Sequence, residues 1–279
     1  MQAGTTDRSF SRRGFLGVAA VGAAGAAGAI PARRLLARQP EAPVTGALPD
    51  GFPSQDYESV RAAVGASHGN MPRITEFVEA RPALAKAAVD WGFGDWETAI
   101  GAASHVGNRE IAEFLMSHGA RPDIFTCAMM GWVDSVRAMV EARPGIQRLY
   151  GPHGFTLMHH ARAGREEAES VRDYLAALGD ADTPYASVPL DDAAREVYVG
   201  VYTFGPGAEE RFEVENDRGS VWIKRPGNFG RRLVSLGDHA FHPIGAEAVR
   251  VVFGVDGGAA RTLTVHDPGP VVTASLIAG

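Results

Sequence analysis

Hydrophobic residues recur at helical spacing through the middle of the chain. In residues 107–123, Ile111, Phe114 and Leu115 fall at positions i, i+3 and i+4, on one face of a helix. Gly119 follows the last turn, where the backbone must take a left-handed conformation that glycine adopts without steric cost. The pattern therefore predicts a helix that ends at Gly119 and buries Leu115.

A shorter segment of small residues precedes this helix. Ala102, Ala103 and Ser104 suit a helix that is pressed closely against a neighbour, and Gly107-Asn108 reads as the turn that follows. The predicted unit is a short helix, a turn, a second helix and a glycine exit. The same order recurs at residues 65–82, 128–144 and 154–182. We expect helix pairs that bury their faces only by stacking on one another.

These units resemble the ankyrin repeat family. The stretch from Gly107 to Asp123 is similar to the second helix and exit of that repeat, and TLMHHA at 156–161 resembles its Thr-Pro-Leu-His-x-Ala. The turn glycines are 38, 24 and 33 residues apart, whereas the family repeats at about 33. The resemblance covers about residues 57–182. It implies a helical solenoid that recognises a protein or extended ligand. It also implies structural roles for Gly107, Leu115, Gly119 and His159, where the side chain of His159 hydrogen-bonds to the backbone in the turn.

The lengthened junction between the first two units, residues 89–98, is rich in aromatic residues. Such junction loops in ankyrin proteins project beside the binding surface, and exposed aromatic rings favour a contact. The alternative is that the rings fold back and cover the irregular junction. The aromatic candidates for binding in this loop are Trp91, Phe93 and Trp96. We also single out Asp95 in the same loop, and His153 and His160 farther along the chain.

Beyond about residue 183 the pattern changes to alternation with a period of two, which is typical of strands. Eight short runs follow, from EVYVGVYTF to PVVTASLI, with turn residues between them. We expect a linker over 183–194 and a small antiparallel barrel or sandwich over 195–279. The runs at 198–202 and 237–241 resemble a lipocalin-like β domain, which implies a module that holds a small or extended ligand. The expected fold is α + β with two domains.

The N-terminus reads SRRGFLG before an Ala- and Gly-rich apolar run. It resembles a twin-arginine export signal over residues 1–37, followed by a linker over 38–56. The resemblance implies export of the folded protein to the periplasm or outside the cell. It also implies recognition by the export machinery through Arg12, Arg13, Phe15 and Leu16. Arg33 and Arg34, just after the apolar run, leave open an uncleaved membrane anchor.

Charge and cysteine content exclude several classes of function. The net charge is −6, and removing residues 1–37 takes away five arginines and one acid, which leaves −10. A body this acidic repels phosphate backbones, so we expect no nucleic-acid partner. The single cysteine, Cys127, permits no intrachain disulfide and no cysteine zinc site. Its apolar surroundings predict a buried core residue.

No catalytic motif stands out in the sequence. His159 and His160 are adjacent and point about 100° apart on a helix, while His239 and His242 fall on opposite faces of an extended strand. HExxH, Gly-x-Ser-x-Gly and Ser-x-x-Lys are absent. We therefore predict no metal, no cofactor and no catalytic residue, and a non-enzymatic binding protein that acts through its repeat surface. The alternative is a small-molecule carrier or hydrolase-accessory protein with its ligand in the β domain.

Overall fold

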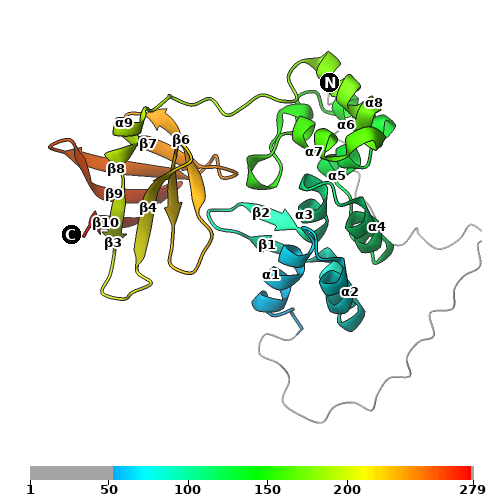
Figure 1. The fold of residues 1–279 in the computed structure, drawn as a ribbon, viewed down its shortest axis with the longest axis horizontal. Coiled ribbons are helices and arrows are strands. Elements are labelled where there is room, and N and C mark those ends of the chain that lie inside the picture. Colours follow the sequence, from blue (N-terminus) through cyan, green and yellow to red (C-terminus); the bar gives the residue numbers. More distant parts are fainter. Residues whose placement is uncertain (1–52, 278–279) are drawn as a thin grey trace, which may run out of the picture. The chain divides into compact units, whose positions relative to one another are not determined.

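The computed structural model describes residues 53–277 of the chain (Figure 1). The predicted export signal, with Arg12, Arg13, Phe15 and Leu16, lies outside the described residues. The described part combines helices and a closed barrel of strands, so the mixed α and β fold class is confirmed. No helix within 53–277 has both the length and the apolar character that a membrane span requires.

Eight helices between residues 57 and 178 of the described part form four pairs. The pairs are α1 (Tyr57–Ala66) with α2 (Met71–Ala80), α3 (Ala99–His105) with α4 (Arg109–Ser117), α5 (Ile124–Met129) with α6 (Val133–Ala142), and α7 (Leu157–Ala163) with α8 (Glu169–Leu178). The first helices also pack in succession, α1 on α3, α3 on α5 and α5 on α7. Because α3 touches α7 as well, the stack is irregular.

Capping side chains mark the starts of most helices, and a glycine follows the end of α4. The N-cap side chains of α1 to α5 and α7 each accept a backbone N–H; they are Asp56, Asn70, Thr98, Asn108, Asp123 and Thr156. Gly119 has a φ of 90°, so its predicted left-handed conformation is confirmed. Leu115 is fully buried, as predicted, and Cys127 is also buried, with 4% of its surface exposed. Gly107 has a positive φ, and a β-carbon at this position would clash with the carbonyl group of Ala163.

The aromatic junction forms a hairpin where the sequence predicted a loop. Strands β1 (Ala88–Asp90) and β2 (Trp96–Thr98) pair antiparallel. The carboxylate of Asp90 accepts the backbone N–H groups of Gly92 and Gly94, which closes the turn. Short 3₁₀ turns complete this half of the chain: η1 (Pro82–Lys86), η2 (Ile146–Arg148), η3 (Pro152–Gly154) and η4 (Arg165–Ala168).

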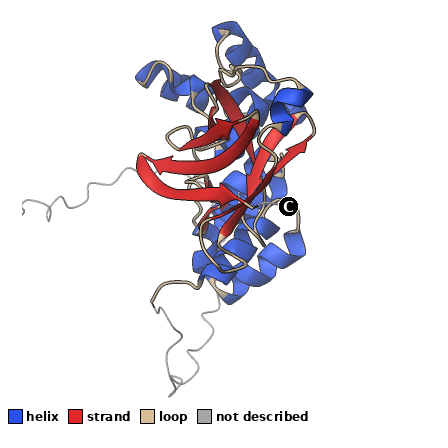
Figure 2. Cartoon of the chain, turned by 90° about the vertical axis from the view of Figure 1, so that its left-hand side faces the viewer, coloured by secondary structure: helices blue, strands red, loops and turns tan. Residues whose placement is uncertain are grey.

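Eight strands between residues 200 and 276 of the described part close into an antiparallel barrel, in which each strand pairs with the next and β10 pairs with β3 (Figure 2). They are β3 (Gly200–Thr203), β4 (Arg211–Asp217), β5 (Ser220–Lys224), β6 (Arg231–Gly237), β7 (Ala240–Pro243), β8 (Arg250–Asp256), β9 (Ala259–Asp267) and β10 (Gly269–Leu276). Alternate residues such as Phe212 and Phe253 fill the interior. The first predicted run starts later than expected, because Asp191 caps a short helix, α9 (Asp192–Glu196), ahead of β3.

Candidate metal centre

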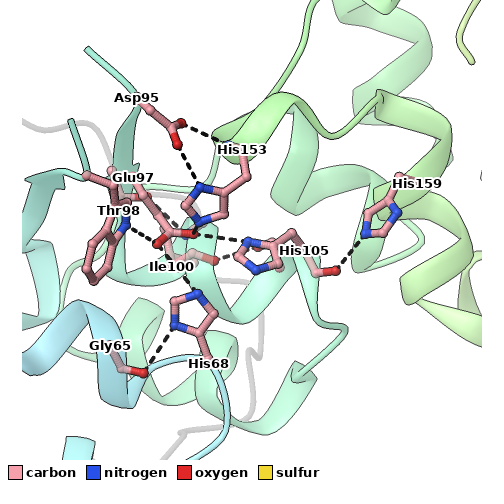
Figure 3. A network of polar contacts seen from close by, with 12 residues as sticks. Gly65, His68, Asp95, Glu97, Thr98, Ile100, His105, His153 and His159 are labelled. Atoms are coloured by element: carbon pink, nitrogen blue, oxygen red, sulfur yellow. Dashed lines mark hydrogen bonds and ion pairs between the residues drawn. The ribbon is translucent and has the colours of Figure 1, made fainter. Parts of the chain in front are cut away.

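Four side chains from four separate segments converge in the helical region (Figure 3). His68 lies in the turn after α1, Glu97 in β2, His105 at the end of α3, and His153 in η3. One potential ligand atom from each lies within 4.8 Å of the others. Stacking of the first two helix pairs brings His68 and His105 together, and the hairpin places Glu97 between them. The cluster is thus a product of the tertiary fold.

The spacing of the four side chains matches one bound ion. Glu97 Oε1 lies 3.0 Å from His105 Nδ1 and 3.3 Å from His153 Nε2, and Glu97 Oε2 lies 3.6 Å from His68 Nε2. Ligands about 2.0–2.1 Å from a tetrahedral zinc ion are about 3.3 Å from each other. The two separations from Glu97 Oε1 are at or just below that value, and one potential ligand atom of each of the four residues lies within 4.8 Å of the others, so the side chains could close around a single ion.

Two of the converging atoms are buried without a hydrogen bond. Glu97 Oε1 and His105 Nδ1 have no hydrogen-bond partner among residues 53–277, although they lie 3.0 Å apart. The pair is close enough for an ion pair but is not aligned as a hydrogen bond. Buried polar atoms without partners are costly and rare in folded proteins. A cation between Glu97 and His105 would satisfy both atoms.

The outer nitrogens of two of the histidines are held in place. Asp95 Oδ2 lies 2.7 Å from His153 Nδ1, and the carbonyl oxygen of Gly65 lies 3.1 Å from His68 Nδ1. Metal-binding histidines commonly donate their second N–H to a carboxylate or a backbone carbonyl, which fixes the tautomer that faces the ion. His68 and His153 both have this arrangement, with Nε2 directed into the cluster.

A hydrogen bond from Trp91 fixes the orientation of the Glu97 carboxylate. The indole nitrogen of Trp91 donates to Glu97 Oε2 at 2.6 Å, which leaves Oε1 as the oxygen that faces His105 and His153. Burial acts to raise the pKa of Glu97, but His105, His153 and His68 together outweigh it and lower that pKa to about 2. Burial acts to lower the pKa of His153, yet Asp95 and Glu97 raise it to about 9. These pKa shifts favour a positive charge on His153 between the carboxylates of Asp95 and Glu97.

The cluster is closed on one side and open on the other. The side chains of Glu97 and His105 are 0% and 7% exposed, whereas those of His68 and His153 are 32% and 23% exposed. A cavity of about 370 Å³ opens on the exposed side; its walls are Gly65, His68, Trp91, His153, Phe229 and Arg231. A small molecule entering this cavity reaches the cluster beside His68 and His153.

Arg231, from β6, adds a positive charge to the wall of this cavity. Its guanidinium lies 2.9 Å from Asp95 Oδ2 and 3.2 Å from His153 Nδ1. The side chain is almost fully buried, and its Nε has no hydrogen-bond partner in the described part of the chain. The cavity thus combines a metal-type ligand set with a buried guanidinium.

The candidate binding residues have different positions. Asp95, Trp91 and His153 take part in the cluster. Phe93 is partly buried and packs against the hydrophobic core of the barrel. Trp96 is 64% exposed and is not one of the four converging residues.

The other histidines of the sequence analysis lie outside the cluster. His160 is fully buried and bonds the carbonyl of Thr156 through Nδ1. His159 Nε2 lies 3.0 Å from the carbonyl oxygen of His105, so it binds backbone at the end of α3. Neither His239 nor His242 belongs to a metal-type cluster within residues 53–277.

His68, Glu97 and His105 were missed by sequence reasoning, although one pattern pointed to two of them. Ala-Ser-His occurs at 66–68 and again at 103–105, at the ends of two helices that the repeat pattern stacks side by side. In sequence comparisons, no protein-family model and no curated protein matches this chain.

Proposed function

We propose that the protein binds one divalent transition-metal ion through His68, Glu97, His105 and His153, and presents it to a small molecule in the adjoining cavity. The observation that carries the proposal is the buried pair of Glu97 Oε1 and His105 Nδ1, which converge without a hydrogen bond. Three imidazoles and one carboxylate favour zinc or a neighbouring first-row ion. Glu97 contributes one oxygen, because Trp91 holds the other.

The cavity walls favour ligand binding over proton transfer. An ion in this site supplies a Lewis acid for a carbonyl or carboxylate oxygen. Among the described residues, the lining of this cavity includes no carboxylate. Of the two nearby carboxylates, Glu97 belongs to the ligand set, and Asp95 is held by His153 and Arg231. Arg231 instead adds positive charge. These features support metal-dependent binding of an anionic small molecule, which develops the carrier alternative of the sequence analysis.

Metal titration of the full-length protein tests this proposal. After chelator treatment and dialysis, calorimetry with zinc chloride should give one site per chain, confirmed by elemental analysis of the gel-filtered complex. His105→Ala removes a ligand, so its zinc affinity should fall at least about 100-fold. His118→Ala, at an exposed histidine of the helical region, serves as the matched control and should bind normally.

A competing hypothesis is that the cluster is a metal-free ion network. In that case the His153 cation, between Asp95 and Glu97, would only tie the hairpin to η3. Wild-type protein would then take up no more zinc than His105→Ala. That result would overturn the metal proposal.

We propose as a second candidate function that the helix pairs form an ankyrin-type stack that docks a protein or extended ligand after twin-arginine export. The left-handed glycine exit at Gly119 and the successive packing of α1, α3, α5 and α7 support the stack. Trp96, exposed on the hairpin, supports a contact surface. Trp96→Ala should then weaken partner binding while zinc uptake stays unchanged, which separates the two candidate functions.

A further inference from the structure

A second and larger cavity, of about 510 Å³, adjoins the cavity at the candidate metal centre. The two share three wall residues, Trp91, Phe229 and Arg231. A volume of this size lies within the range of about 300–1,000 Å³ that is usual for small-molecule sites. The shared walls make the two cavities neighbouring chambers rather than separate sites.

The larger chamber combines an apolar interior with a charged rim. Phe212, Ile223, Val249 and Val265 from the barrel core form its apolar walls. The charged residues that line it are Arg61, Lys224, Arg225, Arg231, Asp90 and Asp267. Lys224 is paired with Glu215 and Arg231 with Asp95, while the guanidinium of Arg61 lies over the rings of Trp91 and Phe229, and the carboxylate of Asp90 accepts two backbone N–H groups. Such walls suit a ligand with an apolar body and one negative charge.

The partition between the chambers consists of side chains. Trp91 and Phe229 meet edge to face with ring centroids 5.9 Å apart, and the Arg61 guanidinium lies 5.7 Å and 5.9 Å from the two ring centroids. Phe229 is 67% exposed and lies in the loop between β5 and β6. The exposed ring of Phe229 is therefore the part of the shared wall that is least enclosed by other residues.

We infer that one ligand occupies both chambers: a monocarboxylate with an apolar chain, its chain in the larger chamber and its carboxylate at the metal centre beside Arg231. Two independent features carry the inference. The chambers share walls, and Arg231, in that shared wall, is a buried guanidinium that pairs with Asp95 through one terminal nitrogen and leaves its Nε without a partner among the described residues. The inference rests on the proposed function, because the metal ion receives the head group.

Calorimetric titration with a series of straight-chain acids tests the inference. Butanoate, hexanoate, octanoate and decanoate are titrated into the zinc-loaded, full-length protein, with zinc content measured separately on the same samples. Each CH₂ that enters the larger chamber should tighten binding by about fourfold, until the chamber is full. His105→Ala should weaken every acid by a similar factor and leave the dependence on chain length intact. Primary alcohols of matched length should bind more weakly than the acids.

A substitution at the rim provides the structural test. Val271 is 64% exposed and lines the larger chamber, so Val271→Trp should fold normally and flatten the dependence on chain length. Val199→Trp changes an exposed valine outside both chambers and should behave as wild type. If the protein takes up zinc but the affinity of the acids does not depend on their chain length, the inference is overturned and the metal proposal is unaffected. Equal affinity for acids and alcohols would also overturn it. Failure to take up zinc would overturn both proposals.

Discussion

Trp91→Phe isolates the contribution of a single hydrogen bond to the candidate metal centre. The change keeps an aromatic ring in the wall between the two cavities and removes only the indole N–H that donates to Glu97 Oε2 at 2.6 Å. Glu97 has no exposed side-chain surface, so Oε2 has little access to solvent when this donor is lost. Without it, Oε2 competes with Oε1 for the ion, and the carboxylate is free to rotate.

The expected magnitude follows from two independent routes. A hydrogen bond to a charged group contributes about 1.5–3 kcal/mol. Loss of an outer-sphere partner of a metal ligand weakens metal binding by about 10–100-fold, which corresponds to about 1.4–2.7 kcal/mol. The two energy ranges overlap. We therefore expect the zinc affinity of Trp91→Phe to fall by about 10–100-fold, which is the range typical for loss of an outer-sphere partner.

Zinc calorimetry at neutral pH measures this effect, with circular dichroism to confirm folding. Trp132→Phe, at a partly exposed tryptophan away from the cluster, is the matched control and should leave the zinc affinity unchanged. An unchanged zinc affinity in folded Trp91→Phe would refute the assignment of Oε1 as the metal ligand held by this bond.

Four further predictions concern stability and export. Burial lowers the pKa of His160 to about 3, so as pH falls the unfolded chain binds a proton on this imidazole before the folded chain does. The free energy of unfolding should therefore decrease below about pH 6.5, by up to about 1.4 kcal/mol per pH unit. In urea melts at several pH values, His160→Phe should lose this pH-dependent part of the stability. Leu115→Asp places a charge in the buried stack and should cost more than about 3 kcal/mol, with an unchanged thermal melt as the contrary result. Gly119→Val should cost about 1–3 kcal/mol and Gly119→Asn much less, because φ is positive there; equal losses in denaturant would argue against this cause. Arg12→Lys with Arg13→Lys should trap the folded protein in the cytoplasm, because lysine lacks the planar guanidinium fork; continued export in cell fractionation would point to another route.

Local patterns predicted the elements that depend on local physics. The period of Ile111 and Leu115 and the position of Gly119 define α4 and its exit, because burial and backbone freedom act within a few residues. Strand alternation likewise predicted the barrel interior. The β1–β2 hairpin escaped prediction because three-residue strands are too short to show a period, and Gly92 and Gly94 look like loop residues.

The candidate site was harder to predict because its members meet only through stacking. Asp95 and His153 were both singled out, yet nothing local joins residues 58 apart in the chain. His68 and His105 end two stacked helices, so their common Ala-Ser-His context is informative only once the stacking of those helices is known. Glu97 sits in the unpredicted hairpin and carries no sequence motif of its own.

X-ray absorption at the zinc edge tests the central claim most directly. Full-length protein loaded with one equivalent of zinc should show a first shell of nitrogen and oxygen at about 2.0–2.2 Å, with the outer-shell scattering of three imidazole rings. His105→Ala should lose one imidazole contribution. A shell of water oxygens without imidazole scattering, or a spectrum that is identical in His105→Ala, would contradict the assignment of this cluster as a metal centre.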